Sequence, residues 1–296
     1  MGEYELIAER FEADRPHLRA VAYRMLGSLS DADDAVQESW LRLSRADKSG
    51  VENLTGWMTT IVSRVCLDML RTRKSRREDA LEPNTPATGA TGRAGCDPQQ
   101  EAMLADAVGV AMLVVLDKLA PAERIAFVLH DVFAVPFEEI GPIVDRSPAT
   151  ARQLASRARR RVQGTSAVPQ AEFNQQRHVV EAFLAASRNG DFDALLAVLD
   201  DDVVFKSDDA AARMGGPKKE VRGAKTIAKL FSGRAQAAKA AMVNGSVGVL
   251  VAPAGRLFLV LLPTVENGKI VRIDAVAEPD RLAMMEVAVL AGSAAG

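Results

Sequence analysis

The segment from Ala80 to Pro98 places the strongest limit on what this chain can fold into. It reads ALEPNTPATGATGRAGCDP, is dense in proline, glycine, threonine and alanine, and has no hydrophobic periodicity. Such a segment has no apolar face to bury in a core, so it is typical of a linker. The 296 residues are enough for two or three domains. The sequence therefore predicts separately folded blocks on either side of this linker.

Helical periodicity fills the chain on both sides of that linker, from Glu3 to Glu78 and again from Gln99 to Gln163. A second linker, Gly164 to Gln170, leads to a block of different character. Asn267-Gly268 lies there between two predicted strands and indicates a tight hairpin, because both residues tolerate positive φ. We expect this third block to be α+β with a largely antiparallel sheet. Its predicted helices are 173–187, 192–199 and 224–231, and its predicted strands are 203–205, 245–251, 256–263 and 269–276.

Charge and cysteine content exclude several classes of protein. The net charge of −2 gives no indication of nucleic-acid binding, but positive charge is concentrated in two short segments. Cys66 and Cys96 belong to no zinc-binding pattern, so we expect neither a metal site nor a disulfide framework. No uncharged apolar run approaches the roughly 18–20 residues needed to span a bilayer. We expect a soluble, cytoplasmic protein without metal or cofactor.

The segment Ser30 to Leu43 (SDADDAVQESWLRL) is predicted to be an amphipathic helix with Ser30 as its N-cap. Its apolar residues recur at helical spacing and predict a buried stripe. The opposite face is either an ordinary solvated surface or a binding surface. That face carries Asp34, Gln37, Glu38 and Arg42.

The next helix, Leu54 to Arg77, becomes strongly basic toward its C-terminal end. Cations there complement the helix dipole, which is the simpler interpretation. Their density exceeds what capping requires, and this favours a contact with phosphate groups. The predicted buried stripe of this helix is Trp57, Ile61, Val65 and Leu70.

Together, DADDAVQESWLRL and GWMTTIVSRVCLDMLRTRKSRR closely resemble domain 2 of the extracytoplasmic-function sigma factors of bacteria. The resemblance implies that the acidic helix face binds the β′ clamp of core RNA polymerase. It also implies that the loop from Ala46 to Leu54 and the basic helix bind and open the −10 promoter element. Trp57 could stack on unpaired bases there, although its register favours a core position. The residues expected to contact the −10 element are Asn53, Thr59, Thr60, Ser63, Arg64, Arg71, Arg73 and Lys74.

The second block contains a helix-turn-helix pattern, with a helix over 137–144, a turn, and a helix over 148–162. Ser147 followed by Pro148 is a strong helix start. Pro142 removes a hydrogen bond inside the first helix, which we expect to be short or kinked. The second helix combines arginine, glutamine and small hydroxyls, as a recognition helix requires. A basic helix that binds an acidic protein is the alternative.

The run from Leu119 to Val162 resembles sigma domain 4 from end to end. The resemblance implies that the second helix reads the −35 element in the major groove, and that core polymerase is bound through both its β′ clamp and its β flap. It also implies that the segment between the two sigma domains threads through the polymerase cleft. The expected −35 residues are Thr150, Arg152, Gln153, Ser156, Arg157 and Arg160.

The order of elements in the third block resembles the SnoaL-like cone fold, which a subgroup of these sigma factors carries as a C-terminal extension that tunes activity in cis. Residues 208–224 and 278–282 partly match two motifs of that subgroup. The tryptophan-proline motif of some relatives is missing from the preceding linker, so this chain is similar to a sister subgroup. The regulatory residues implied by the resemblance are Asp208, Asp209, Lys218, Pro279 and Asp280.

Three functions remain open for this third block: an intramolecular brace on the sigma domains, a small-ligand pocket, and an enzyme. An enzyme of this fold uses an Asp or His in its cavity. His178 could point inward or outward, and capping suits Asp208 and Asp209 better than general-base chemistry does. The brace is the preferred interpretation, no catalytic residue is assigned, and we do not expect an enzyme.

The sequence thus predicts a multidomain protein with two all-α sigma domains, a helical-bundle domain 2 and a helix-turn-helix domain 4, followed by an α+β SnoaL-like domain. We expect an alternative sigma factor that binds core polymerase and promoter DNA and does not bind a membrane. Its C-terminal domain binds a small ligand only if the pocket interpretation holds. The rival function is a ligand-sensing or catalytic SnoaL-like protein fused to a DNA-binding module. The expected boundaries are 1–78 for domain 2, 79–98 for the linker, 99–163 for domain 4, 164–172 for the second linker and 173–296 for the last domain.

Overall fold

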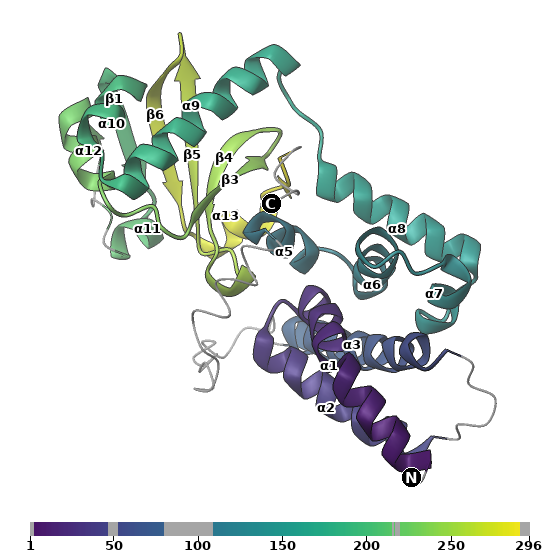
Figure 1. The fold of residues 1–296 in the computed structure, drawn as a ribbon. Helices are drawn as coiled ribbons and strands as arrows, with labels where there is room; N and C mark the ends of the chain where they lie inside the picture. The colour runs from purple at the N-terminus through teal and green to yellow at the C-terminus, as the bar shows by residue number, and fades with distance from the viewer. Residues whose placement is uncertain (1–2, 47–52, 80–108, 215, 217–219, 291–296) are drawn as a thin grey trace. The chain divides into compact units, whose positions relative to one another are not determined.

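The computed structural model describes residues 3–46, 53–79, 109–214, 216 and 220–290 (Figure 1). The first linker, Cys96, most of the loop from Ala46 to Leu54, and Lys218 lie outside these residues. The chain forms two compact units. Among the described residues, the first combines those up to residue 79 with residues 118–160, and the second combines residues 109–117 with those from 161 to 290.

Three long helices form the N-terminal part of the first unit and pack on one another: α1 (Glu3–Leu26), α2 (Leu29–Arg45) and α3 (Leu54–Asp79). Their shared core excludes water almost completely, and Leu18, Met25 and Val62 are all fully buried. The predicted cap of α2 is wrong. The helix begins at Leu29, and Ser28 is its N-cap, because the Ser28 hydroxyl accepts a hydrogen bond from the amide of Asp31.

The rest of the first unit is helical as well. It contains α6 (Pro121–Phe127), which continues as a π-helical turn, η1 (Val128–Val132), and then α7 (Phe137–Ile143) and α8 (Pro148–Gln163). The predicted helix-turn-helix is confirmed in α7 and α8, and α7 is short, as Pro142 led us to expect. Ser147 caps α8 by accepting a hydrogen bond from the amide of Thr150.

The turn between α7 and α8 needs a glycine on α7. A Cβ at Gly141 would lie 2.8 Å from the carbonyl oxygen of Arg146, closer than any side chain could approach without displacing the turn. The amide of Arg146 also donates to the carbonyl of Gly141 at 2.9 Å. Gly141 therefore lets the turn fold back tightly onto α7.

The second unit is built on one sheet in the order β2-β1-β6-β5-β4-β3-β7. Neighbouring strands are antiparallel except β1 and β6, which are parallel. The predicted α+β block with a largely antiparallel sheet is confirmed. The strands are β1 (Leu199–Ser207), β2 (Val221–Arg222), β3 (Ala238–Val243), β4 (Ser246–Val251), β5 (Leu259–Glu266), β6 (Lys269–Val276) and β7 (Val287–Ala288).

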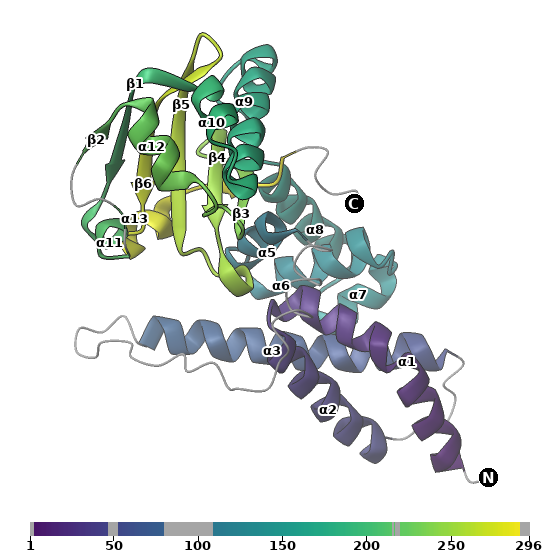
Figure 2. The ribbon, with the colours of Figure 1, turned by 60° about the vertical axis from the view of Figure 1, so that its left-hand side comes forward.

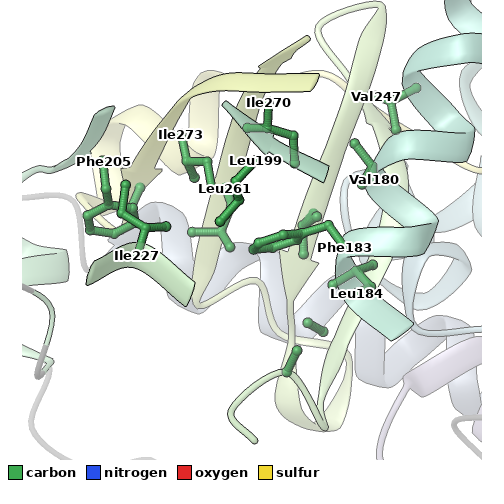
Figure 3. Close-up of a cluster of buried hydrophobic side chains, with 14 of the residues drawn as sticks. Val180, Phe183, Leu184, Leu199, Phe205, Ile227, Val247, Leu261, Ile270 and Ile273 are labelled. Atoms are coloured by element: carbon green, nitrogen blue, oxygen red, sulfur yellow. The ribbon is translucent and has the colours of Figure 1, made fainter. Parts of the chain in front are cut away.

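Helices α9 (Gln170–Asn189), α10 (Phe192–Val198) and α12 (Ala224–Phe231) cover one face of this sheet (Figures 1 and 2). Two shorter helices, α11 (Asp209–Arg213) and α13 (Pro279–Met284), follow β1 and β6. The main core of the unit lies between the sheet and the covering helices, where Phe183, Leu199 and Ile227 are almost completely buried (Figure 3). The order of elements is the one expected for the SnoaL-like fold.

Two hairpins of the sheet turn on an Asn-Gly pair. Asn267 and Gly268 both have positive φ and join β5 to β6, as predicted. Asn244 and Gly245 form a second such turn, between β3 and β4. The sequence prediction missed this second turn because it left β3 out.

The second unit also contains α5 (Val110–Asp117), which packs on β3, on β7 and on the 3₁₀ turn η2 (Pro253–Gly255). Leu113, Val114 and Leu116 of this helix are almost fully buried. A Cβ at Gly255 would lie 3.0 Å from the Cβ of Leu113, so the two backbones approach closely. The last turn of α8 is attached to the same unit, because the amide of Val289 donates to the carbonyl of Val162 at 2.8 Å.

Candidate functional site

The exposed face of α2 carries the four residues predicted to bind core polymerase. Asp34, Gln37, Glu38 and Arg42 are all exposed, while the opposite side of the helix packs into the three-helix core. Arg42 donates to Glu38 at 3.0 Å and to Asp68 of α3 at 3.1 Å. Hydrogen bonds to these carboxylates raise the pKa of Arg42, with Glu38 as the larger cause.

Leu41 also lies on this face and was missed by the sequence prediction. It is 44% exposed and falls between Gln37 and Glu38 around the helix, one turn beyond them. A single exposed leucine is common on protein surfaces, so Leu41 does not by itself mark a binding site. Its signal was available in the sequence, because Leu41 breaks the polar face of an otherwise regular amphipathic pattern.

The predicted −10 residues divide between the two sides of α3. Arg64, Arg71 and Lys74 are exposed. Thr60 is half-buried, and its hydroxyl donates to the carbonyl of Gly56. Asn53 is exposed and caps the helix by accepting a hydrogen bond from the amide of Gly56 at 3.0 Å.

Thr59 and Ser63 do not lie on an exposed polar face, so that part of the prediction is wrong. Thr59 is 7% exposed and Ser63 is fully buried. Their hydroxyls donate to the carbonyls of Thr55 and Thr59 at 2.8 and 2.7 Å. A hydroxyl that bonds to its own helix can be buried at little cost, and a periodicity argument does not anticipate this.

Trp57 and Ile61 are half-buried, so the predicted stripe is also shifted. The fully buried stripe of α3 runs instead through Met58, Val62 and Cys66, together with the correctly predicted Val65 and Leu70. Burial raises the pKa of the Cys66 thiol to about 12, which leaves it un-ionised and unreactive at neutral pH.

Three arginines of α3 contact other parts of the first unit. Arg64 donates to the carbonyl of Pro142 at 3.4 Å, and Arg71 pairs with Asp145 at 3.4 Å. Arg73 is half-buried, pairs with Asp31 and donates to the carbonyl of Leu26. Arg73 thus links α3 to the start of α2, a structural role that the sequence prediction did not include.

The exposed face of α8 carries the residues predicted to read the −35 element. Arg152, Gln153, Ser156, Arg157 and Arg160 are exposed, and their spacing places them on one side of the helix. Ala151, Ala155 and Ala158 form the buried side. The sixth predicted residue, Thr150, is half-buried with its hydroxyl 2.9 Å from that of Ser147.

Two contacts orient α8 within its motif. The guanidinium of Arg152 lies 5.3 Å from the centre of the Phe137 ring, and Arg159 donates to Asp131 at 2.7 Å. The exposed cations and the glutamine are therefore carried by a helix with fixed rotation about its axis. Such a face can contact both base edges and phosphates of a major groove.

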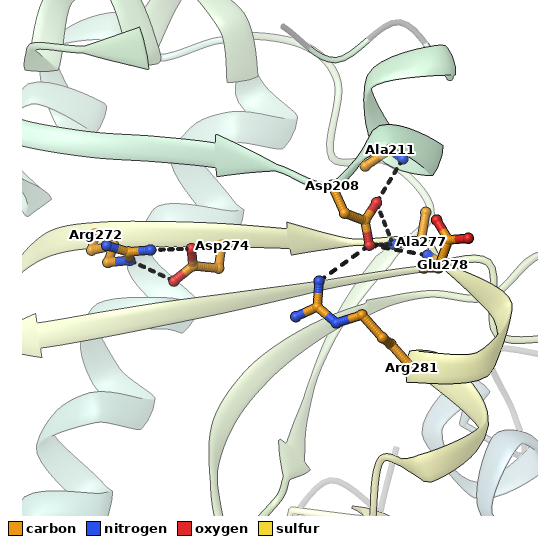
Figure 4. Close-up of polar contacts among 7 residues, drawn as sticks. All are labelled: Asp208, Ala211, Arg272, Asp274, Ala277, Glu278 and Arg281. Carbon is orange, nitrogen blue, oxygen red and sulfur yellow. Dashed lines mark hydrogen bonds and ion pairs between the residues drawn. The ribbon is translucent and has the colours of Figure 1, made fainter. Parts of the chain in front are cut away.

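Asp208 is the one predicted regulatory residue with an extensive set of contacts (Figure 4). Its carboxylate caps α11 by accepting a hydrogen bond from Ala211, and it also accepts from the amides of Ala277 and Glu278. Arg281 of α13 lies 3.4 Å away. The expected capping role of Asp208 is confirmed, whereas Asp209, Pro279 and Asp280 are exposed.

Two opposing effects act on the pKa of Asp208. Burial alone would raise the pKa, but the three backbone amides and the charge of Arg281 outweigh it, so the pKa is lowered from its ordinary value of 3.8. Asp208 is therefore ionised at neutral pH, and its negative charge strengthens its bonds to the three amides and to Arg281. A carboxylate held in this way is unsuited to act as a general base.

A cavity of about 290 Å³ lies in the second unit between the sheet and its covering helices. Apolar side chains make up most of its lining, and Ser207 and Arg234 are the polar side chains among the described residues that line it. The expected alternatives for His178 are resolved: the ring is exposed on α9, with Nδ1 2.9 Å from the carbonyl oxygen of Asn174.

Within the described ranges, no three His, Cys, Asp or Glu side chains are grouped closely enough to hold a metal ion. No helix in that same part of the chain is both long and apolar enough to cross a membrane.

Comparison with known proteins assigns a family to each of the two helical parts of the chain. The family model for Sigma-70 region 2 matches residues 10–76, and the model for Sigma-70, region 4 matches residues 110–162. The ECF RNA polymerase sigma factor SigJ of Mycobacterium tuberculosis is 37% identical over 290 residues, which cover 92% of this chain and 91% of SigJ. A probable ECF RNA polymerase sigma factor of the same species, SigI, is 35% identical over 283 residues and covers 95% of this chain and 97% of its own length.

The crystal structure of Mycobacterium tuberculosis SigJ covers 93% of this chain and 97% of its own, with 32% identity and a TM-score of 0.42. The family assignment follows from the sequence matches, which extend over nearly the full length of both relatives.

Proposed function

The chain belongs to the extracytoplasmic-function sigma factors of RNA polymerase, and on that premise we propose which surface of each domain acts in promoter-specific initiation. It is an alternative sigma factor that directs core polymerase to specific promoters. Since polymerase and promoter DNA are its partners, it acts in the cytoplasm.

The exposed face of α2 binds the β′ clamp of core polymerase. Three features support this assignment: the carboxylates of Asp34 and Glu38, the exposed Leu41, and the bond that ties Arg42 to Asp68. An apolar residue inside a charged rim is the usual anatomy of a protein interface. Leu41 is therefore the expected centre of the contact.

The exposed side of α3 binds the −10 element. Asn53, Thr60, Arg64, Arg71 and Lys74 remain in this proposal, because each is accessible at least in part. Thr59 and Ser63 are withdrawn, and Arg73 supports the bundle through Asp31. The exposed arginines supply phosphate contacts, which position a protein on DNA without reading its sequence.

The face of α8 reads the −35 element, and this face is the observation that carries the promoter-recognition proposal. Arg152 and Gln153 lie near the N-terminal end of the helix, where recognition helices contact base edges. Arg157 and Arg160 lie one and two turns further along and are suited to phosphates. Region 4 as a whole also binds the β flap of the polymerase, as the family resemblance implies.

The C-terminal domain modulates activity in cis by holding both ends of region 4. The family match for region 4 begins at residue 110, yet α5 is part of the sheet unit and buries Leu113 and Leu116 there. At the other end of region 4, Val162 is hydrogen-bonded to Val289. Any rearrangement of region 4 on the polymerase must therefore act on contacts with the sheet domain.

The proposed function assigns no catalytic role to the C-terminal domain. The described residues that line its cavity include no Asp, Glu, His, Tyr or Cys that could transfer a proton. His178 is exposed on α9, and the Asp208 carboxylate is held by backbone amides. These observations also disfavour the rival interpretation of a catalytic domain fused to a DNA-binding module.

Substitution of Gly255 by valine tests the modulation in cis. The new side chain would press on Leu113 of α5, because a Cβ at this position already lies 3.0 Å from the Leu113 Cβ. Run-off transcription with core polymerase and a cognate promoter should change by about threefold or more relative to the unsubstituted protein, which corresponds to roughly 0.7 kcal/mol.

Gly268→Val is the matched control. Gly268 also has positive φ, but the nearest atom to its Cβ position is the Gln175 amide nitrogen at 3.6 Å. Both variants carry similar backbone strain, and only Gly255→Val disturbs α5. Equal transcript yields from the two variants would overturn modulation through α5.

A further inference from the structure

The cavity of the C-terminal domain has an aromatic inner wall. Phe183 of α9 and Phe205 of β1 each lie edge-on to Phe231 of α12, with ring centroids 5.1 and 5.6 Å apart. All three line the cavity, together with Leu184 and Leu261. Figure 3 shows Phe183, Leu184, Phe205 and Leu261 gathered between the sheet and the helices. A space of about 290 Å³ here is close to the lower end of the range for small-molecule sites.

Two apolar side chains of the cavity lining are also exposed. Met214 and Phe258 line the cavity and are 41% and 52% exposed, which makes them two of the few large apolar side chains exposed among the described residues. Exposed apolar side chains around a concave site favour an occupant that covers them.

Arg234 supplies the one charged side chain among the described residues that line this cavity. It is exposed, and its guanidinium has no hydrogen-bond or ion-pair partner within the described part of the chain. No carboxylate in the described lining balances its charge. An anionic group is therefore the complement that this site lacks.

The backbone that carries Arg234 is held in place from α9. Arg188 donates through Nε to the carbonyl of Ala235 at 3.3 Å and through Nη2 to the carbonyl of Ala238. Gln236 donates in turn to the carbonyl of Arg188 at 3.0 Å. On the other side of Arg234, the amide of Gly233 donates to the carbonyl of Ser187 at 2.7 Å. Because these bonds hold the backbone before and after Arg234, the starting point of its side chain is preorganised beside the cavity.

We propose that this cavity binds a small amphiphile with one anionic head group, such as a medium-chain carboxylate. The aromatic and aliphatic wall takes an apolar body of roughly ten carbon atoms, since a space of about 30 Å³ is needed per water-sized group. Arg234 binds the carboxylate at the rim. A ligand of this class would allow the C-terminal domain to influence transcription. This effect on transcription rests on the proposed function, whereas binding of the ligand does not.

Calorimetric titration of the full chain tests the charge selectivity. The probes are decanoate, decan-1-ol and decylammonium, each below the concentration at which it forms micelles. Decanoate should bind about tenfold more tightly than decanol, a ratio expected for one charge-assisted contact at a partly exposed site, and decylammonium should bind most weakly.

Arg234→Gln should reduce the affinity for decanoate about tenfold, to that of decanol, and leave decanol binding unchanged. Arg256→Gln is the matched control, because Arg256 is an exposed arginine two residues before Phe258 in the sequence and does not line the cavity. Its affinity for decanoate should equal that of the unsubstituted protein. Unchanged decanoate binding by Arg234→Gln would overturn the assignment of the head group.

Leu259→Trp tests whether decanoate binds in the cavity. Leu259 is half-buried in the cavity wall, and the indole ring of tryptophan would fill the space. Near-ultraviolet circular dichroism checks that this variant is folded, and decanoate should raise the melting temperature of the unsubstituted protein alone. Equal decanoate binding by a folded Leu259→Trp variant would exclude the cavity. Failure of all three probes to bind the unsubstituted protein would overturn the proposal, whether the space is too small or is filled by another segment of the chain.

Run-off transcription with and without decanoate separates the ligand from the sigma function. Binding measured without polymerase does not depend on promoter recognition. If decanoate does not bind but transcription is normal, the ligand proposal alone is overturned. If decanoate binds but no promoter-specific transcript forms, the assigned promoter contacts alone are overturned.

Discussion

The carboxylate of Asp208 joins three segments of the C-terminal domain. It receives hydrogen bonds from the first turn of α11 and from the backbone between β6 and α13, and it faces Arg281 (Figure 4). The two sequence motifs that resemble those of the sigma subgroup therefore meet at this residue. Their co-occurrence in one chain has a structural reason, because the second motif supplies the Glu278 amide and the Arg281 guanidinium that contact the first motif's aspartate.

We expect Asp208→Ala to destabilise this junction by about 1–3 kcal/mol, because two or more buried amides lose their acceptor. Hydrogen exchange at the amides of Ala277 and Glu278 measures the effect directly. Asp209→Ala is the control, since Asp209 is exposed. Exchange rates equal to those of the unsubstituted protein would contradict the role assigned to Asp208.

The contribution of Asp208 should also depend on pH. Its folded-state pKa is lowered, so its stabilising effect is fully present above the ordinary value of 3.8 and is lost as the pH falls through the folded-state value. The difference in exchange between Asp208→Ala and the unsubstituted protein should therefore be constant near neutral pH and shrink below about pH 4. A difference that shrinks near pH 6 instead would implicate another group.

Single hydroxyl residues mark a limit of sequence prediction. Thr59 and Ser63 are polar and occur in a basic helix, so the sequence pattern predicts that they lie on its exposed face. Each bonds to a carbonyl four residues earlier and can therefore be buried like an apolar residue. Arg73 shows the same limit for charge, because pairing with Asp31 makes a half-buried position acceptable.

Among the elements, α2 carries the surface that we propose binds core polymerase. Its buried side is small and aliphatic, and its exposed side surrounds Leu41 with Asp34, Gln37 and Glu38. Of these residues, Leu41 gains most from being covered, because removing its apolar surface from water is favourable.

Leu41→Glu should reduce the affinity for core polymerase about tenfold or more, because a carboxylate would be buried at the centre of the contact without a partner. Fluorescence anisotropy of labelled sigma factor titrated with core polymerase measures this change. Met284→Glu is the matched control, since Met284 is an exposed apolar residue on α13, 76% exposed, and belongs to the other unit. Equal affinities for the two variants would place the clamp contact elsewhere.

Elements with strong local signals were predictable. Helix α12 and strand β6 have the predicted bounds, and the β5–β6 hairpin follows from Asn267-Gly268. Strand β3 was missed because its sequence, AKAAMV, is rich in alanine, which has low β propensity. It is a strand because β4 and β7 pair with it on both sides, and such pairing is not encoded locally.

At the scale of the whole molecule, the partner of α5 could not be predicted. The segment is apolar nearly all round, which shows that it is buried but not by what. Sequence similarity groups it with region 4, whereas its packing groups it with the sheet. The compact units of the structure and the bounds of the family match therefore divide this chain at different residues.

The charge of the whole molecule predicts weak binding to free DNA. A net charge of −2 leaves only the basic faces of α3 and α8 to attract a duplex. At about 150 mM salt, the free protein should bind a promoter duplex at least a hundredfold more weakly than the holoenzyme does, and a scrambled −35 sequence should hardly matter. Fluorescence anisotropy over a salt series measures this, and nanomolar binding by the free protein would contradict it.

The membership of α5 in the sheet unit also sets an order of events during synthesis. About 170 residues separate the end of α5 from the end of β7, the strand on which it packs. At roughly 5–20 residues per second, the apolar side chains of α5 wait on the order of ten to thirty seconds for their partner. Region 2 can fold while the ribosome is still translating, but region 4 receives its first helix in place only when the chain is nearly finished. Nascent and prematurely terminated chains thus lack a complete region 4, and they expose an apolar helix that chaperones can recognise.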